Sequence, residues 1–170
     1  MDNNNLNYLK SELKKIDHHF ELKDFNYVIQ KSKKIIKKNP EQVPFYNYLG
    51  LAYRQKGKLY LAEKIFHEAH KINPNSLSVL TNLAAIYRHL EDFTQSIKYF
   101  EIGIKINPNN VNILCNYANL KRDLNDLEGS INLYKKALEI DNNLPIVLQN
   151  LAGAYQIIGE FDLSIKYLKI

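Results

Sequence analysis

The stretch KINPNS, residues 71–76, returns 34 residues later as KINPNN, residues 105–110. Pro40, Pro74 and Pro108 follow the same spacing, and Asn142 holds the next position of the series. A fixed period of this length is typical of chains built from repeated helical units. The sequence therefore divides into windows, which cover 9–42, 43–76, 77–110, 111–144 and, incompletely, 145–170.

Small and large residues recur at fixed slots, which we count from the first residue of each window. Slot 8 of the last four windows holds Gly50, Ala84, Ala118 and Ala152, and slot 20 holds Ala62, Ser96, Ser130 and Ser164. Slot 24 holds Phe66, Phe100, Tyr134 and Leu168. Small residues let two helices approach closely, and a large residue fills the space beside them. The pattern therefore predicts two packed helices in each window.

Hydrophobic periodicity supports the same division. Each window holds two stretches of about 13 residues whose apolar positions recur at helical spacing. Between them lie the polar or glycine-containing breaks QKGK, HLED, DLND and IIGE. Asp92, Asp126 and Glu160 stand where a second helix would begin, which suits the positive end of its dipole. Because one helix pair cannot bury its own apolar face, neighbouring pairs must stack.

The slot pattern resembles the tetratricopeptide repeat, which has Leu-Gly, Tyr, a small residue, an aromatic residue, Ala and Pro at these offsets. The match covers residues 43–170, whereas the first window departs from it with His19 at slot 11 and Ser32 at slot 24. The resemblance implies an all-α fold, a right-handed superhelical solenoid of antiparallel helix pairs. We expect about five units in a single domain over residues 1–170, the first degenerate and the last truncated.

Composition and charge narrow the class of function. The formal charge of +5 is concentrated toward the N-terminal end, and Cys115 is the only cysteine. No glycine-rich phosphate loop, nucleophile elbow or metal-ligand set stands in the sequence. We therefore predict a cytoplasmic protein segment that is not an enzyme, has no cofactor or metal, and binds neither nucleic acid nor membrane. A catalytic domain beyond residue 170 stays open.

The last window ends differently from the others, because no polar closing helix follows FDLSIKYLKI at residues 161–170. Phe161, Ile165, Leu168 and Ile170 would lack a covering neighbour. We expect the chain to be a fragment of a longer repeat protein, and self-association through this end is the alternative. In that case Ile165→Glu or Leu168→Glu should shift a concentrated sample toward monomer.

A polar arc runs along the first helix of each window, at slots 2, 5, 6, 9, 12 and 13. The family resemblance implies that this arc faces the concave groove. Slot 6 holds Tyr48 and then asparagines, and slot 12 holds three arginines. The candidate peptide-binding residues are Asn47, Tyr48, Arg54, Asn82, Arg88, Asn116, Asn119, Arg122 and Asn150.

The chemistry of this arc suits a polypeptide ligand. An asparagine amide offers a donor and an acceptor together, so it can bond a peptide backbone whatever the side chains are. The arginines would add a bias toward carboxylates. The asparagine series resembles the repeat superhelix of O-linked N-acetylglucosamine transferase, whereas the lysine that a chaperone-tail clamp needs at slot 5 is missing. We therefore predict an interaction module for an extended, acidic-leaning protein segment.

Two alternatives remain open at this point. The arc residues could bond one another between adjacent repeats and serve only the stack. The chain could also be the substrate-recruiting segment of a larger glycosyltransferase or sulfotransferase whose catalytic domain lies beyond residue 170. If the groove binds a peptide, Asn82→Ala with Asn116→Ala should weaken the ligand and leave the melting temperature nearly unchanged.

Overall fold

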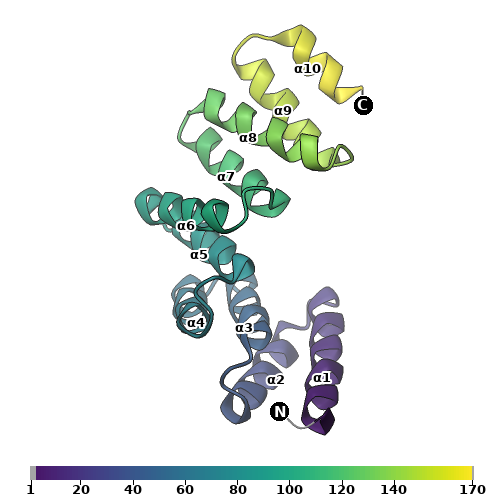
Figure 1. The fold of residues 1–170 in the computed structure, drawn as a ribbon, viewed down its shortest axis with the longest axis vertical. Helices are drawn as coiled ribbons and strands as arrows, with labels where there is room; N and C mark the ends of the chain where they lie inside the picture. The colour runs from purple at the N-terminus through teal and green to yellow at the C-terminus, as the bar shows by residue number, and fades with distance from the viewer. Residues whose placement is uncertain (1–2, 170) are drawn as a thin grey trace. The chain divides into compact units, whose positions relative to one another are not determined.

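The structure, a computed structural model, describes residues 3–169, which fold into ten helices and contain no strand. The helices are α1 (Asn3–Glu21), α2 (Phe25–Lys38), α3 (Val43–Gln55), α4 (Leu59–Ile72), α5 (Leu77–His89), α6 (Phe93–Ile106), α7 (Val111–Asp123), α8 (Leu127–Ile140), α9 (Pro145–Ile157) and α10 (Phe161–Leu168). Short turns join consecutive helices (Figure 1). The predicted all-α class is confirmed. None of the helices described is long and apolar enough to cross a membrane.

Two helices fall in each window, as the periodicity predicts. We call the odd-numbered helices A helices and the even-numbered ones B helices. From α3 to α9 every A helix begins at slot 1 and has 13 residues, and α4, α6 and α8 have 14 residues each. The first A helix is longer, with 19 residues, and begins before the predicted window does. The last B helix, α10, has only 8 residues.

The chain divides into two compact units, which we describe separately. The first unit runs up to Ile86 and the second begins at Tyr87, so the boundary falls inside α5. In the first unit α1, α2 and α3 pack on one another, and α3 packs on α4. In the second unit α7 packs on α8, α8 on α9, and α9 on α10. The single-domain organisation over residues 1–170 stays a prediction.

The core occupies the slots that the repeat pattern assigns to it. At slot 24, Phe66 and Tyr134 are 0% exposed and Phe100 is 1% exposed. At slot 8, Gly50 lies so close to the ring of Phe66 that an added Cβ would meet it at 2.6 Å. Small residues at this slot therefore let the A helix rest directly on the aromatic ring of its own B helix.

The turn between the A and B helices has one backbone geometry in all five windows. Slot 15 has a positive φ each time, at Lys23, Gly57, Glu91, Asn125 and Gly159. In this left-handed conformation the Cβ of an L-residue lies too close to the following carbonyl oxygen, which raises its conformational energy, whereas glycine has no Cβ. The next residue caps the B helix, and in Asp24, Asp92 and Asp126 a carboxylate oxygen accepts a backbone N–H of the first turn. The predicted acidic helix starts at Asp92 and Asp126 are thus N-caps, whereas Glu160 precedes α10 without a side-chain capping bond.

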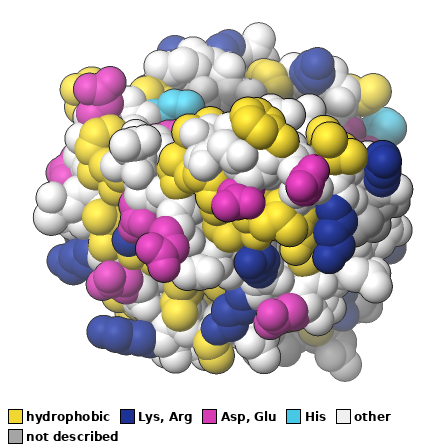
Figure 2. All heavy atoms as spheres, turned by 90° about the horizontal axis from the view of Figure 1, so that it is seen from above, with side chains coloured by type: hydrophobic (Ala, Val, Ile, Leu, Met, Phe, Trp, Pro, Cys, Tyr) yellow, Lys and Arg dark blue, Asp and Glu magenta, His cyan; other side chains and the backbone are white. Residues whose placement is uncertain are grey.

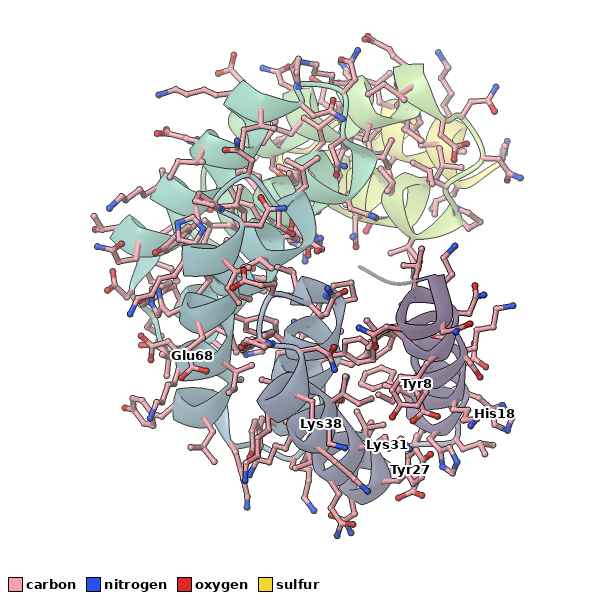
Figure 3. All side chains as sticks on the ribbon, turned by 60° about the horizontal axis from the view of Figure 1, so that its bottom comes forward. Tyr8, His18, Tyr27, Lys31, Lys38 and Glu68 are labelled. Atoms are coloured by element: carbon pink, nitrogen blue, oxygen red, sulfur yellow. The ribbon has the colours of Figure 1, made fainter. Side chains whose placement is uncertain are left out.

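The degenerate first window has serine at slot 24, and it joins α1 to α2 through polar contacts as well as through the ring contact between Phe20 and Phe25. The carboxylate of Glu12, whose side chain is 4% exposed, forms ion pairs with Lys31 of α2 and with Lys15 at 2.9 Å. Figure 3 shows Lys31 between α1 and α2, near Tyr8 and Tyr27, whereas His18 points away from α2. The ion pair therefore fastens the first A helix to its B helix.

Candidate ligand-binding face

The polar arc of the A helices, in the second unit, forms a hydrogen-bonded network between adjacent repeats. The side-chain amide of Asn150 on α9 donates to Asn119 Oδ1 on α7 at 3.3 Å. Arg122 Nη1 donates to Asn150 Oδ1 at 3.3 Å, and the Tyr134 hydroxyl donates to Asn119 Oδ1 at 2.5 Å. We call these four residues the amide network. It holds two A helices and one B helix in fixed register.

An open hollow lies beside the amide network on α9. Arg122 and Asn150 line it together with other residues of α9 and one of α10, namely Gln149, Ala152, Gly153, Gln156 and Leu168. A Cβ added to Gly153 would meet nothing within 4 Å, so the absent side chain leaves the floor of the hollow free. We call this feature the α9 hollow. Amide and guanidinium groups surround a floor of backbone that a ligand can approach.

The first unit makes the same kind of bond one repeat earlier. Asn82 Nδ2 on α5 donates to Asn47 Oδ1 on α3 at 2.8 Å, and the Tyr48 hydroxyl donates to Asp17 Oδ1 on α1 at 2.5 Å. Burial and this bond, followed by the nearby negative charges of Asp17 and Glu21, raise the pKa of Tyr48 to about 12. The residue at slot 6 therefore bonds the preceding A helix in Tyr48, Asn82 and Asn150 alike.

The three arginines at slot 12 differ in their surroundings. Arg88 forms an ion pair with Asp123 of α7, with both Nε and Nη2 at 2.5 Å from Oδ2. Arg122 belongs to the amide network. Arg54 is half-buried, burial lowers the pKa of its guanidinium, and it forms no ion pair with any residue that the structure describes. A partly desolvated guanidinium of this kind is a strong site for a carboxylate.

Two further residues of the polar arc, Asn116 and Cys115, make contacts or have surroundings within their own helix α7. Asn116 Nδ2 donates to the backbone oxygen of Asn112 in its own helix at 2.7 Å, which ties that amide to α7 rather than to a neighbour. Cys115 is half-buried, and burial raises the pKa of its thiol, which lowers its nucleophilicity. Among the described residues, no three His, Cys, Asp or Glu side chains gather as a metal site.

The structure brings together part of the predicted set. Asn119, Arg122 and Asn150 meet in the second unit, and Asn47 meets Asn82 in the first. Sequence reasoning missed three partners, Asp17, Asp123 and Tyr134, because nothing in a 34-residue register shows which neighbours face them. It also passed over Gln149 and Gln156, which share slots 5 and 12 with chosen residues and could have been found by that register.

These features define a class of protein: a repeat protein of stacked helix pairs that carries a polar face along its A helices. Two tetratricopeptide repeat family models match, one at residues 43–76 and one at residues 75–143, which together make up more than half of the chain. The chain belongs to the tetratricopeptide repeat family. Its general function as a protein–protein interaction module follows from that membership.

Solved structures agree with the fold. A crystal structure of MamA is 20% identical, with a TM-score of 0.75 over 91% of this chain and 90% of that one. PilF of Pseudomonas aeruginosa is 12% identical, with a TM-score of 0.84 over 93% and 72% of the two chains. TTC0263, a thermophilic tetratricopeptide repeat protein of Thermus thermophilus, is 16% identical, with a TM-score of 0.80 over 93% and 87%. No curated protein matches the sequence significantly.

Proposed function

We propose that the chain binds an extended segment of another protein on the polar face of its A helices, with the α9 hollow as the principal contact. One observation carries this proposal: no atom lies within 4 Å of the place where a side chain of Gly153 would begin. The exposed side-chain amides of Gln149 and Gln156, and that of Asn150, line the same hollow. A peptide backbone needs donors and acceptors close together, and this hollow supplies both.

The amide network leaves capacity for a ligand. A primary amide has two N–H donors and two acceptor lone pairs, and the bonds of Asn150 to Asn119 and Arg122 use one of each. The remaining donor and acceptor match the carbonyl and N–H of an extended peptide. Because both protein bonds fix the rotamer of Asn150, the ligand need not order this side chain on binding.

The charges favour an acidic segment. Arg122 lines the α9 hollow, and in the first unit the half-buried Arg54 forms no ion pair with any described residue. Arginine binds carboxylates through two parallel N–H bonds, which gives direction as well as strength. Acidic side chains on the ligand would therefore add affinity to the backbone contacts. Self-association through the C-terminal helix is a separate part of the proposed partner set.

The competing interpretation, in which the arc serves only the stack, gains support from the bonds between repeats. Those bonds involve Asn47, Asn82, Asn119 and Asn150, so alanine variants of these residues change stability and binding together. Gly153 is the better test position because it has no side chain to contribute to the stack. The face would serve equally in a substrate-recruiting segment of a larger glycosyltransferase or sulfotransferase.

The test uses a display library of unstructured peptides of about 12 residues, which span about 40 Å when extended. Peptides are selected for binding to the full chain, and the affinity of each selected peptide is measured by fluorescence anisotropy. We expect enrichment of acidic peptides that bind in extended form. Gly153→Gln fills the α9 hollow and should weaken the selected peptides by about tenfold or more, which corresponds to about 1.4 kcal/mol. Its melting temperature should stay the same or rise, since glycine disfavours a helix interior.

The matched control is Lys136→Gln, which introduces the same side chain on α8, outside the residues that line the hollow. It should leave peptide affinity unchanged. Equal loss of affinity in both variants, or undiminished binding to Gly153→Gln, would place the ligand elsewhere. Failure to select any peptide would favour the structural interpretation of the polar arc.

A further inference from the structure

The arginines at slot 12 stand in the second, third and fourth windows, and they are the only arginines of the chain. Two of them bond an oxygen on the following A helix. Arg88 pairs with the carboxylate of Asp123 at 2.5 Å, and Arg122 donates to the side-chain oxygen of Asn150 at 3.3 Å. The fold therefore shows what an arginine at this slot binds, which is an oxygen acceptor and, where one is present, a carboxylate.

Arg54 is the arginine of this series that lacks such an acceptor. Its guanidinium forms no hydrogen bond or ion pair with any residue that the structure describes. Asp123, the partner of Arg88, stands at slot 13 of the next window, and the residue at that slot in the window after Arg54 is His89, which has no carboxylate. All five N–H donors of Arg54 therefore stay available.

Arg54 lies on the polar side of α3. It stands seven residues after Asn47, so the two side chains share one side of the helix, about 10 Å apart along its axis. Asn47 accepts the hydrogen bond from Asn82 on that side. Arg54 is half-buried, and burial lowers the pKa of its guanidinium, as expected for a cation that has lost water without gaining a carboxylate.

The charge of the first unit favours a negatively charged ligand. Residues 1–86 hold 14 lysines and arginines against 8 aspartates and glutamates, whereas residues 87–170 hold 9 against 10. Figure 2 looks onto the end where Figure 1 shows α9 and α10, and basic and acidic side chains are interspersed there. A net positive unit attracts negatively charged segments and raises their rate of association. Long-range attraction therefore favours the unit that holds Arg54.

We propose that Arg54 binds one carboxylate of the polypeptide ligand and selects the ligand by it. This inference rests on the proposed function, because it requires a segment on the polar face. A guanidinium binds a carboxylate through two parallel N–H groups, which fixes its direction as well as its position. The preference for acidic segments is then a preference for one acidic position in register with Arg54. An aspartate or glutamate side chain, or the C-terminal carboxylate of the segment, supplies the group.

The first experiment needs no polypeptide ligand and uses acetate as the probe. The three arginines give three Nε–Hε cross-peaks in a proton–nitrogen correlation spectrum of the full chain, which single lysine substitutions assign. Acetate should shift the Arg54 cross-peak saturably, with a dissociation constant on the order of 10–100 mM. The Arg88 cross-peak should not respond in this way, because Asp123 already pairs with Arg88.

Two probes serve as controls for acetate. Sodium chloride at the same ionic strength measures the effect of screening, and acetamide has the shape of acetate without its charge. An Arg54 cross-peak that shifts no more in acetate than in chloride overturns the proposal. Spectra at two protein concentrations exclude association of the chain as a cause of shifts, since Phe161, Ile165 and Leu168 of α10 are exposed, as predicted. Ile170, which was predicted with them, lies outside the described residues.

The second experiment uses the peptides selected for binding to the full chain. Each acidic residue is replaced by its amide in turn, and a further peptide has an amidated C-terminus. One of these changes should weaken binding to the wild type by about tenfold. The same change should have little effect on binding to Arg54→Gln, because the two members of a pair are coupled.

The matched variants separate the guanidinium from its charge. Arg54→Lys should recover only part of the affinity that Arg54→Gln loses, since an ammonium lacks the planar fork. Lys64→Gln removes one positive charge from an exposed position on α4 of the same unit and should leave affinity unchanged. Circular dichroism should show all three variants folded. An equal loss of affinity in Arg54→Gln and Lys64→Gln would be an effect of net charge and overturns the proposal.

The outcomes also distinguish the role of Arg54 from the proposed function. If the peptides bind and Gly153→Gln weakens them, but no carboxylate is coupled to Arg54, the proposed function stands and the role of Arg54 is overturned. If no peptide is selected, the proposed function fails, and the acetate titration by itself decides whether Arg54 is a carboxylate site.

Discussion

Asn82 Nδ2 donates to Asn47 Oδ1 at 2.8 Å, so an amide on one A helix bonds an amide on the A helix of the preceding repeat. Both side chains are half-buried. The polar arc therefore contributes to repeat stacking before any ligand binds. Deleting one of these asparagines therefore changes stability, and deletion alone does not separate this stacking role from the proposed binding role.

The Asn82–Asn47 bond should be measurable in a double-mutant cycle. Asn82→Ala and Asn47→Ala should each lower the free energy of unfolding by about 1 kcal/mol, since each leaves one half-buried amide unpaired. The double variant should lose less free energy of unfolding than the two single variants together, and the difference, the coupling energy, should be at least about 0.5 kcal/mol. Urea denaturation followed by circular dichroism gives these values. Asn132→Ala, at an exposed position of α8, corrects for the helix propensity of alanine, and strict additivity would rule the coupling out.

The ion pair of Glu12 should make stability depend on acid pH. Burial by itself raises the pKa of this carboxyl, but its bonds to Lys31 and Lys15 and their charges outweigh burial, so the pKa is lowered from its ordinary 4.5. A lowered pKa gives stability that is present above the unfolded-state value and is lost as pH falls through the folded-state value. Glu12→Gln should cost about 2 kcal/mol at neutral pH, and this difference should shrink on acidification below about pH 4.5.

Denaturant titrations of the wild type and Glu12→Gln across the acid range check this prediction. Glu21→Gln is the control, because Glu21 is exposed on the same helix and should change stability little. A difference between the wild type and Glu12→Gln that stays constant from neutral to acid pH would contradict the proposed linkage.

The left-handed turn at slot 15 offers a stabilising substitution. Glu91 has a φ of 60°, which an L-residue adopts at a cost of about 1 kcal/mol or more. Glu91→Gly should therefore raise the free energy of unfolding by about 0.5–1 kcal/mol, after allowing for the added freedom of the unfolded chain. Glu139→Gly, within the last turn of α8, should lower it by a similar amount. Thermal melting of the two variants should give shifts of opposite sign.

Two glycines in A helices should respond oppositely to alanine. At Gly50 the new methyl group would meet the Phe66 ring at 2.6 Å, and the ring is fully buried, so Gly50→Ala should destabilise by about 1–3 kcal/mol. At Gly153 the methyl group meets nothing within 4 Å, so Gly153→Ala should stabilise by up to about 1 kcal/mol. Chemical denaturation compares them directly, and a stabilising Gly50→Ala would show that the packing is looser than the structure indicates.

The sequence by itself determined the repeat length, the start of each A helix from residue 43 onward and most of the buried slots, whereas α1 begins before its window and Leu168 at slot 24 is 56% exposed. Those features follow from local periodicity. Helical geometry places every residue at a given slot on the same face of its helix, so a slot that repeatedly holds a large apolar or aromatic residue, such as that of Tyr134, is predicted to be buried. It also placed Asn150 and Arg122 on one face of their helices. It could not show that the two side chains bond each other, because that contact joins residues 28 apart on different helices.

Tertiary structure decided what each polar side chain contacts. Lys121 stands at a slot that holds tyrosine in the other repeats from residue 43 onward, and only the fold shows that its ammonium reaches Asp126 at 2.8 Å and lies over the ring of Tyr117. Likewise, slot 15 has glycine in only two windows, yet the same backbone turn forms in all five. Helix packing imposes these outcomes, because many buried contacts outweigh a single local preference of about 1 kcal/mol.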